Sequence, residues 1–280
     1  MATETQNSIL ITGCSSGIGY DCAHFLRASG WRVFASCRAE SDCTRLRAEG
    51  FESPRIDYED EASIKAGLAA TLSATGGTLD ALFNNGAYAI PGAVEDLPRA
   101  ALRQNFEANL FGYHDLTRRV IPVMRAQGHG RILNCSSVLG FAAMKWRGSY
   151  NTTKFAMEGL SDTLRLELRG SGIHVILIQP GPIGTDIRQK SVPHFEKWID
   201  WEGSALRPLY EATLIKRLYA PKGAPDPFEL APRAVSLKVL RALTARRPAT
   251  RYKITTPTYV MAALRRALPR RALDNLLARL

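Results

Sequence analysis

The sequence has no long apolar run, no paired cysteine motif and no recognisable leader, and each absence argues against a class of protein. No apolar stretch approaches the ~20 residues that a membrane-spanning helix needs. The N-terminus, MATETQNS, is polar and carries no positive-then-apolar signal pattern. The five cysteines are scattered, without a CxxC pair or a zinc-ligand spacing. We therefore expect a cytoplasmic protein with reduced thiols and no metal site.

The composition is that of an ordinary globular chain. Hydrophobic residues make up 45% and charged residues 22% of its 280 residues, which excludes the disordered class. Internal repeats and low-complexity linkers are absent, so the chain predicts a single domain over residues 1–255, followed by an extension over residues 256–280.

The net charge of +11 is unevenly distributed. Between Arg241 and Leu280, ten basic residues stand against one acidic residue, Asp274, so this segment carries +9. The first 240 residues are left with +2 and are nearly neutral. The basic character therefore belongs to the tail. Because a nucleic-acid-binding module and interleaved aromatic residues are missing, we expect no nucleic-acid partner.

Short apolar runs alternate with stretches of helical length. Runs that are apolar throughout are typical of strands covered on both faces, and the alternation indicates parallel order. We therefore predict an α/β fold with a doubly wound, mostly parallel, Rossmann-like sheet and helices on both faces. The expected strands are 8–12, 31–36, 79–85, 130–136, 173–180 and 251–255, and the expected helices are 20–29, 63–74, 99–125 and 149–169.

Two regions depart from this alternation. Residues 187–228 are rich in aromatic residues and proline, and we interpret them as a lid over the substrate. A helical stripe is expected there at Leu206, Leu209, Tyr210, Leu214 and Leu218. In the tail, Thr256-Pro257 indicates a helix start and Pro269 a break. Leucines opposite arginines make this extension basic and amphipathic, and they lie at Leu273, Leu276, Leu277 and Leu280.

A glycine-rich turn follows the first expected strand. In ILITGCSSGIGY, Gly13, Gly17 and Gly19 stand between that strand and a helix. Glycines permit a tight turn and a close approach of the backbone to a pyrophosphate, and the helix N-terminus attracts negative charge. A tight turn without a ligand is the alternative. The position at the first strand–helix junction favours a nucleotide site.

The end of the second strand bears on the choice of nucleotide. An acidic residue at this place usually holds the ribose 2′-hydroxyl of NAD. Here Cys37 stands in that position and Arg38 follows it. A guanidinium can bind a 2′-phosphate that a carboxylate would repel, so NADP(H) is favoured over NAD(H). The alternative for Arg38 is a solvated surface charge.

In its motifs the chain resembles the short-chain dehydrogenases/reductases, over roughly residues 7–185. Within that family it looks most like the branch of 17β-hydroxysteroid and retinol dehydrogenases and their bacterial relatives. The motifs, in the family's order and spacing, are Thr12-Gly13-x-x-x-Gly17-Ile18-Gly19, Asn84-Asn85-Gly86, Asn109, the serine pair of NCSSVLG, Tyr150-x-x-x-Lys154 and PGPIGT at 180–185.

The resemblance implies a catalytic role for four residues. Tyr150 would exchange a proton with the substrate oxygen, and Lys154, one helical turn away, would lower its pKa and bind the nicotinamide ribose. Ser137 would hold the substrate oxygen, with Ser136 as the competing choice. Asn109 would hold a water molecule in a proton relay. Without the other motifs, Tyr150 and Lys154 could equally be a ring packed on a lysine stem.

The resemblance also implies which residues surround the cofactor. The usual family order Asn-Asn-Ala-Gly reads Asn-Asn-Gly-Ala here. Asn84, Gly86 and Ala87 would line the adenosine half, and Asp57, expected to follow a strand, would contact the adenine amine. The full expected set is Gly13, Ser15, Ser16, Gly17, Ile18, Gly19, Arg38, Asp57, Asn85, Gly86, Tyr150, Lys154, Pro180, Ile183 and Thr185.

The expected activity is the interconversion of an alcohol and its ketone or aldehyde on a bulky, apolar small-molecule substrate. A homodimer or homotetramer is the expected assembly, with peripheral membrane contact through the tail as a further expectation. The alternative from another class is a catalytically silent, nucleotide-sensing regulatory protein of the same fold. Such proteins typically lose the tyrosine or the lysine, and this chain keeps both.

Overall fold

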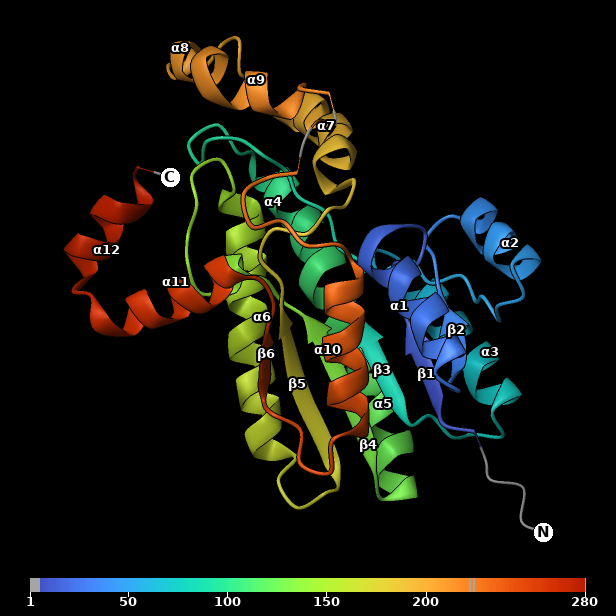
Figure 1. Cartoon of the computed structure of the whole chain (residues 1–280). Helices are drawn as coiled ribbons and strands as arrows, with labels where there is room; N and C mark the ends of the chain where they lie inside the picture. The colour runs from blue at the N-terminus through green and yellow to red at the C-terminus, as the bar shows by residue number, and fades with distance from the viewer. Residues whose placement is uncertain (1–5, 222, 224, 280) are drawn as a thin grey trace.

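A parallel sheet of six strands lies at the centre of the computed structural model, which describes residues 6–221, 223 and 225–279 (Figure 1). Its strand order is β2-β1-β3-β4-β5-β6, and every pair of neighbours is parallel. This confirms the predicted sheet. The strands are β1 (Ser8–Ile11), β2 (Arg32–Ala35), β3 (Ala81–Asn84), β4 (Gly130–Cys135), β5 (Ile173–Gln179) and β6 (Arg251–Lys253).

Helices cover both faces of the sheet, as the uninterrupted apolar strands require. On one face α1 (Gly17–Ala28) and α10 (Arg233–Thr244) bury their apolar sides together with α2 (Glu40–Ala48). On the other face α3 (Glu61–Ala74) packs beside the helix α5 (Gly112–Gln127), and the end of α6 (Gly148–Glu167) adds Leu164. The doubly wound α/β class is therefore confirmed.

The long helix expected over residues 99–125 is interrupted in its middle. It consists of α4 (Arg99–Phe106), a π-helical turn η1 (Glu107–Phe111) and α5. Within η1 the hydrogen bonds shift by one residue, so that Gly112 N–H bonds to the carbonyl of Glu107. Such turns often occur at functional sites. This turn carries Asn109.

The strand expected before Asp57 is reduced to two isolated bridges. Glu52 pairs with Phe34 and Arg55 pairs with Cys37, and no regular strand forms between them. The prediction of a strand here was wrong for a local reason: Pro54 lies between the bridges and cannot donate a backbone hydrogen bond to the ladder.

The lid predicted over residues 187–228 lies above the carboxyl ends of the strands (Figure 1). It contains α7 (Ile187–Trp198), α8 (Arg207–Leu209), a π-helical turn η3 (Tyr210–Leu214) and α9 (Ile215–Leu218). Tyr210, Leu214 and Leu218 are buried in an apolar cluster with Phe195, as the helical stripe predicts. The prediction that Leu209 belongs to this buried stripe was wrong, because 46% of its surface is exposed.

The tail forms two helices beside the lid, α11 (Thr256–Ala267) and α12 (Arg270–Leu277). Pro257 stands in the first turn of α11 and Pro269 caps α12, so both proline signals are confirmed. Leu273 is buried, whereas Leu276 and Leu277 are half-buried and Leu280 lies outside the described residues. No helix in the described part of the chain is long and apolar enough to cross a membrane.

Candidate active site

The glycine-rich turn between β1 and α1 is built for close backbone contact. Gly13 and Gly17 have φ values of 69° and 60°, which favour glycine. A Cβ atom on Gly13 would lie 2.4 Å from the Cα of Gly86, and one on Gly19 would lie 2.3 Å from the carbonyl oxygen of Gly13. Ile18, between the second and third glycines, packs against the apolar core. The turn therefore leaves the N-terminus of α1 open to a ligand.

Two cations reach this turn from distant parts of the chain. Ser16 caps α1, but its hydroxyl makes no bond to the helix backbone. It accepts a hydrogen bond from Lys190 of α7 instead, with 2.6 Å between Nζ and Oγ. The guanidinium of Arg45 donates to the carbonyl oxygen of Ser15 at 2.7 Å. Arg45 is also paired with Glu49 at 2.9 Å, so Lys190 is the cation that adds positive charge at a helix end that already favours anions.

The second strand ends with Cys37 facing the core and Arg38 exposed. Burial raises the pKa of the Cys37 thiol to about 12. Burial lowers the pKa of His194, and the charges of Arg38 and Lys197 lower it further. His194 stacks on Tyr88 with 4.0 Å between ring centroids.

The turn after β3 is tied to the glycine-rich turn through Thr12. The backbone N–H of Asn85 donates to Thr12 Oγ1 at 2.9 Å, and the Asn85 amide donates to the carbonyl oxygen of Thr12 at 3.0 Å. A Cβ atom on Gly86 would lie 3.2 Å from the Cα of Gly13. The unusual order Asn-Asn-Gly-Ala therefore places a glycine where the two turns touch.

Asn84 does not line the cofactor cleft, and this corrects the expectation. Its side chain is fully buried and bonds to Thr117 at 3.0 Å, to Asn134 at 2.9 Å and to the hydroxyl of Tyr58 at 2.8 Å. All its polar atoms are occupied, so it joins the sheet to neighbouring elements. Asp57 lies half-buried and accepts the backbone N–H of Glu59 at 3.1 Å.

Tyr150 and Lys154 lie one turn apart near the start of α6. The ammonium of Lys154 is 5.4 Å from the centroid of the Tyr150 ring and donates to the carbonyl oxygen of Cys135 at 2.6 Å. Lys154 is only 1% exposed, and burial lowers its pKa to about 8. It is therefore mostly charged at neutral pH and is held between the helix and the end of β4.

Ser137 stands beside Tyr150 at the carboxyl end of β4. Its Oγ accepts the backbone N–H of Leu139 at 3.1 Å, which leaves its own O–H free to donate. Burial raises the pKa of Tyr150, whereas the Ser137 hydroxyl and the charge of Arg147 lower it. Lowering by Lys154 stays a prediction.

Ser136 faces the interior rather than Tyr150. It is 2% exposed, and its Oγ lies 2.4 Å from where a Cβ atom on Gly140 would stand. Its hydroxyl has no hydrogen-bond partner among the described residues. This geometry favours Ser137 as the serine that meets a substrate.

Asn109 is buried in the π-helical turn with its amide fully engaged. It accepts the backbone N–H of Tyr88 at 3.1 Å and donates to the carbonyl oxygen of Tyr88 at 2.8 Å and to Thr153 at 3.3 Å. Its amide therefore fixes the segment that carries Tyr88 against α6. A water-holding role for Asn109 stays a prediction.

The segment after β5 closes the site from the side of the lid. The carbonyl oxygen of Pro180 accepts the backbone N–H of Val138 at 2.7 Å, and Ile183 pairs with Leu230. A Cβ atom on Gly17 would lie 3.1 Å from Cγ2 of Thr185, so Thr185 stands against the glycine-rich turn. The expected cofactor-binding residues thus gather at the carboxyl edge of one sheet.

Comparison with known proteins decides the family. The model of the family described as short chain dehydrogenase matches residues 7–195. The uncharacterized oxidoreductase YbbO of Escherichia coli is 37% identical over 273 residues, which cover 97% of this chain and 94% of YbbO. The chain belongs to the short-chain dehydrogenase/reductase family.

Solved structures of the short-chain dehydrogenase/reductase family share the fold. A Burkholderia phymatum member in complex with NAD is 24% identical, with a TM-score of 0.76 and coverage of 95% of this chain and 94% of its own. A variant of the actinorhodin polyketide ketoreductase with NADPH is 26% identical, with a TM-score of 0.70 and coverage of 90% and 97%.

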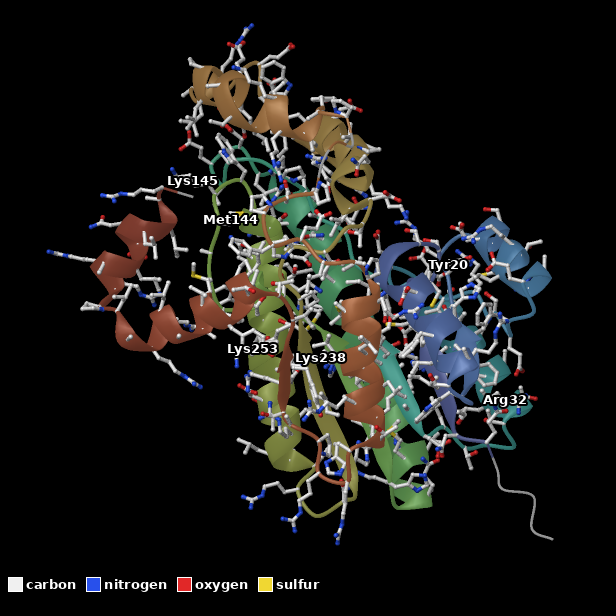
Figure 2. All side chains as sticks on the ribbon, viewed as in Figure 1. Tyr20, Arg32, Met144, Lys145, Lys238 and Lys253 are labelled. Atoms are coloured by element: carbon white, nitrogen blue, oxygen red, sulfur yellow. The ribbon has the colours of Figure 1, made fainter. Side chains whose placement is uncertain are left out.

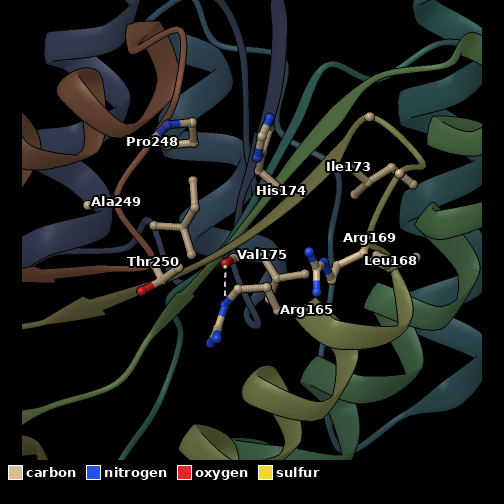
Figure 3. A pocket seen from close by; sticks show the side chains of 12 residues that line it. Arg165, Leu168, Arg169, Ile173, His174, Val175, Pro248, Ala249 and Thr250 are labelled. Carbon is tan, nitrogen blue, oxygen red and sulfur yellow. Dashed lines mark hydrogen bonds between the residues drawn. The ribbon is translucent and has the colours of Figure 1, made fainter.

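A cavity of about 250 Å³ lies at the opposite edge of the sheet (Figure 3). Arg165, Arg169 and His174 line it near the amino ends of β5 and β6, and Arg165 Nε donates to the carbonyl oxygen of Val175 at 3.4 Å. In open α/β sheets ligands bind beyond the carboxyl ends of the strands. This cavity is therefore separate from the dehydrogenase/reductase site.

Proposed function

We propose that the chain is an NADP(H)-dependent oxidoreductase that interconverts a primary or secondary alcohol and its aldehyde or ketone. The observation that carries this proposal is that Tyr150, Ser137 and Lys154 gather at the end of β4, on the same carboxyl edge of the sheet as the glycine-rich turn. A proton donor, a hydrogen-bond donor for the substrate oxygen and a buried cation meet at the edge where a dinucleotide would end.

The residues at this edge fit a dinucleotide. Side chains at Gly13, Gly17 or Gly19 would collide with neighbouring atoms, so the backbone of this turn can come close to a pyrophosphate. The N-terminus of α1 adds a helix dipole that favours the negative charge. Thr185 stands against the same turn and can hold the phosphate from the opposite side. Similar proteins hold NAD or NADPH, which supports a nicotinamide cofactor.

Two cations support a cofactor with a 2′-phosphate. Arg38 is exposed just after β2, and Lys190 reaches Ser16 in the glycine-rich turn. Cys37 points into the core, so no acidic side chain at the end of β2 competes for a ribose 2′-hydroxyl. Charge-assisted hydrogen bonds to phosphate favour NADP(H).

The proton path follows from the geometry around Tyr150. The nicotinamide cofactor would supply or accept the hydride. During reduction the Tyr150 hydroxyl donates its proton to the substrate oxygen, and the free O–H of Ser137 donates a hydrogen bond to the same atom. Lys154 places a positive charge near the phenolate that forms, which stabilises it. Alcohol oxidation follows these steps in reverse.

The lid indicates the apolar character of the substrate. Its core joins Phe195, Tyr210 and Leu214 to Ile90 and Tyr88, which lead toward the active site. A bulky apolar body would bury its surface against these side chains, at roughly 25 cal/mol per Å². We infer a substrate with such a body attached to the reacting carbon.

The test is a panel of hydroxysteroids, retinoids, long-chain alcohols and oxoacyl compounds, each assayed with NADPH or NADP⁺ and with NADH or NAD⁺. We expect turnover of at least one apolar carbonyl compound with NADPH. Tight NADPH binding without turnover of any panel member would instead favour a nucleotide-sensing protein. Binding is measured by quenching of protein fluorescence, which separates the two.

A further inference from the structure

Arg147 is a half-buried cation without a partner among the described residues, beside the active site. It caps α6 one turn before Tyr150. Its carbonyl accepts the backbone N–H of Asn151, yet no described residue accepts a hydrogen bond from its guanidinium or forms an ion pair with it. Arginine is rarely buried unless paired, because loss of hydration destabilises the charge. Burial accordingly lowers the pKa of Arg147.

Two further arginines act on Arg147. Arg217 of α9 and Arg188 of α7 both lower its pKa, whereas Tyr150 raises it, and no carboxylate among the described residues forms an ion pair with it. Arg217 forms an ion pair with Asp226, and Arg188 donates to the carbonyl oxygen of Arg217 at 3.4 Å. Among the described residues, Arg147 is thus the member of this cluster whose guanidinium has neither a hydrogen bond nor an ion pair.

The backbone holds Arg147 in this position. The preceding residue, Trp146, has a φ of 63°, which is an unfavourable conformation for a bulky side chain. It is maintained because the carbonyl oxygen of Trp146 accepts the N–H of Gly92 at 3.0 Å and its ring packs 4.6 Å from the ring of Tyr210. Trp146 joins the apolar lid core, and Arg147 follows it at the N-terminus of α6, the helix that carries Tyr150.

We infer that Arg147 binds an anionic group, a carboxylate or phosphate, on the substrate, close to the carbon that reacts at Tyr150. This inference rests on the proposed function and deepens it, because it adds a charged end to an otherwise apolar substrate. A planar guanidinium with unused donors matches such an oxyanion in geometry and in charge. Because Arg147 and Tyr150 are one helical turn apart, we expect the anionic group near the reacting carbonyl.

The first experiment measures binding without turnover. The probes are 4-oxodecanoate and its methyl ester, which differ in one negative charge, and their dissociation constants are measured by calorimetry with the full-length protein. We expect the acid to bind ten- to hundredfold more tightly than the ester, and Arg147→Met to abolish the difference. The matched control is Arg125→Met, which removes the same charge from an exposed position at the end of α5. That variant should retain the difference.

The second experiment measures turnover of the same pair with NADPH. Arg147→Met should raise KM for the acid and leave KM for the ester unchanged, whereas any change in kcat should be equal for the two compounds, because the charge of Arg147 also lowers the pKa of Tyr150. The substitution should also raise Tm, because it removes an unpaired charge from a half-buried position. Equal binding of acid and ester by the wild type, or an equal rise of KM for both compounds in Arg147→Met, would overturn the inference. Selective binding of the acid without any NADPH oxidation would instead contradict the proposed function.

Discussion

Lys190 on the lid helix α7 lies within hydrogen-bond distance of Ser16 in the glycine-rich turn, at 2.6 Å from Nζ to Oγ. The two residues are 174 positions apart, yet they join the lid to the nucleotide site. Thr185 and His194 contact the site from the same segment, on Gly17 and Tyr88. A phosphate bound at this place would therefore contact both the glycine-rich turn and α7 and favour the arrangement in which they lie together.

The first prediction is that Lys190 contributes to the preference for NADP(H). With Arg38, it should give the wild type a roughly ten- to hundredfold higher kcat/KM with NADPH than with NADH. Lys190→Gln should lower this ratio about three- to tenfold, because an exposed charge is screened by solvent. The combined change with Arg38→Gln should remove most of the preference.

The control for this prediction is Lys197→Gln, on the same helix. Lys197 is exposed and lies over the ring of Trp198 at 4.5 Å, away from the glycine-rich turn. Its removal should leave the cofactor ratio unchanged. A wild type that prefers NADH would show that neither Arg38 nor Lys190 meets a 2′-phosphate.

The second prediction separates the roles of Tyr150 and Lys154. Tyr150→Phe removes the proton donor but leaves the glycine-rich turn intact, so kcat should fall by ~10²–10⁴-fold with little change in the dissociation constant of NADPH. Lys154→Met should impair both turnover and NADPH binding. The measurements are steady-state kinetics and fluorescence titration. Near-normal turnover by Tyr150→Phe would refute the proton path.

The third prediction concerns the pH dependence of reduction. Burial lowers the pKa of Lys154 to about 8, so its ammonium is charged below that pH and loses its charge above it. Burial raises the pKa of Tyr150, which keeps its hydroxyl protonated over the same range. Since kcat/KM reports the free enzyme, it should decline as pH rises through about 8. A profile that is flat from pH 7 to 10 would show that the charge of Lys154 is not needed.

Much of the fold was predictable from local patterns. Uninterrupted apolar runs such as SILI and ALFN specify strands covered on both faces, and the six strands predicted from such runs form, whereas the strand expected before Asp57 does not. Positions that require glycine for steric reasons, such as Gly13, were also predictable, because no other residue tolerates both the positive φ and the close approach of Gly86. These features depend on sequence neighbours or on a fixed turn geometry.

Other features depend on the packing of distant segments, which spacing does not reveal. Lys190 was missed because only the folded lid brings it to Ser16. Asn84 was assigned to the cofactor, although its partners Thr117 and Asn134 lie on elements far along the chain. The missing partner of Arg147, among the residues that the structure describes, is likewise visible only after the lid helices have been placed around it.

The tail packs partly on its own domain. Leu273 of α12 is 4% exposed, and the ammonium of Lys145 donates to the carbonyl oxygen of Ala278 at 2.6 Å. Figure 2 shows Lys145 and Met144 in the segment between the lid and the C-terminal helices. The arginines of α11 and α12 remain exposed, at Arg265, Arg266, Arg270 and Arg271. The buried leucine therefore packs on the protein itself, whereas the four arginines form a basic face that is exposed.

The fourth prediction is that these four arginines bind an anionic membrane surface. Each basic residue near such a surface contributes about 1 kcal/mol, so replacing all four with glutamine should weaken binding to phosphatidylserine-containing vesicles at least tenfold. The variant should keep its Tm and its NADPH affinity, since Leu273 and the cofactor residues are untouched.

The control replaces four exposed arginines elsewhere, Arg99, Arg103, Arg125 and Arg169, with glutamine. Vesicle sedimentation at low and high salt measures binding, and light scattering of the same samples shows whether the protein is a homodimer or homotetramer. If the two variants lose binding equally, net charge alone explains the attraction. If a variant truncated after Thr256 differs from the wild type in scattering mass, and the wild type does not bind vesicles, the tail contacts a partner subunit instead.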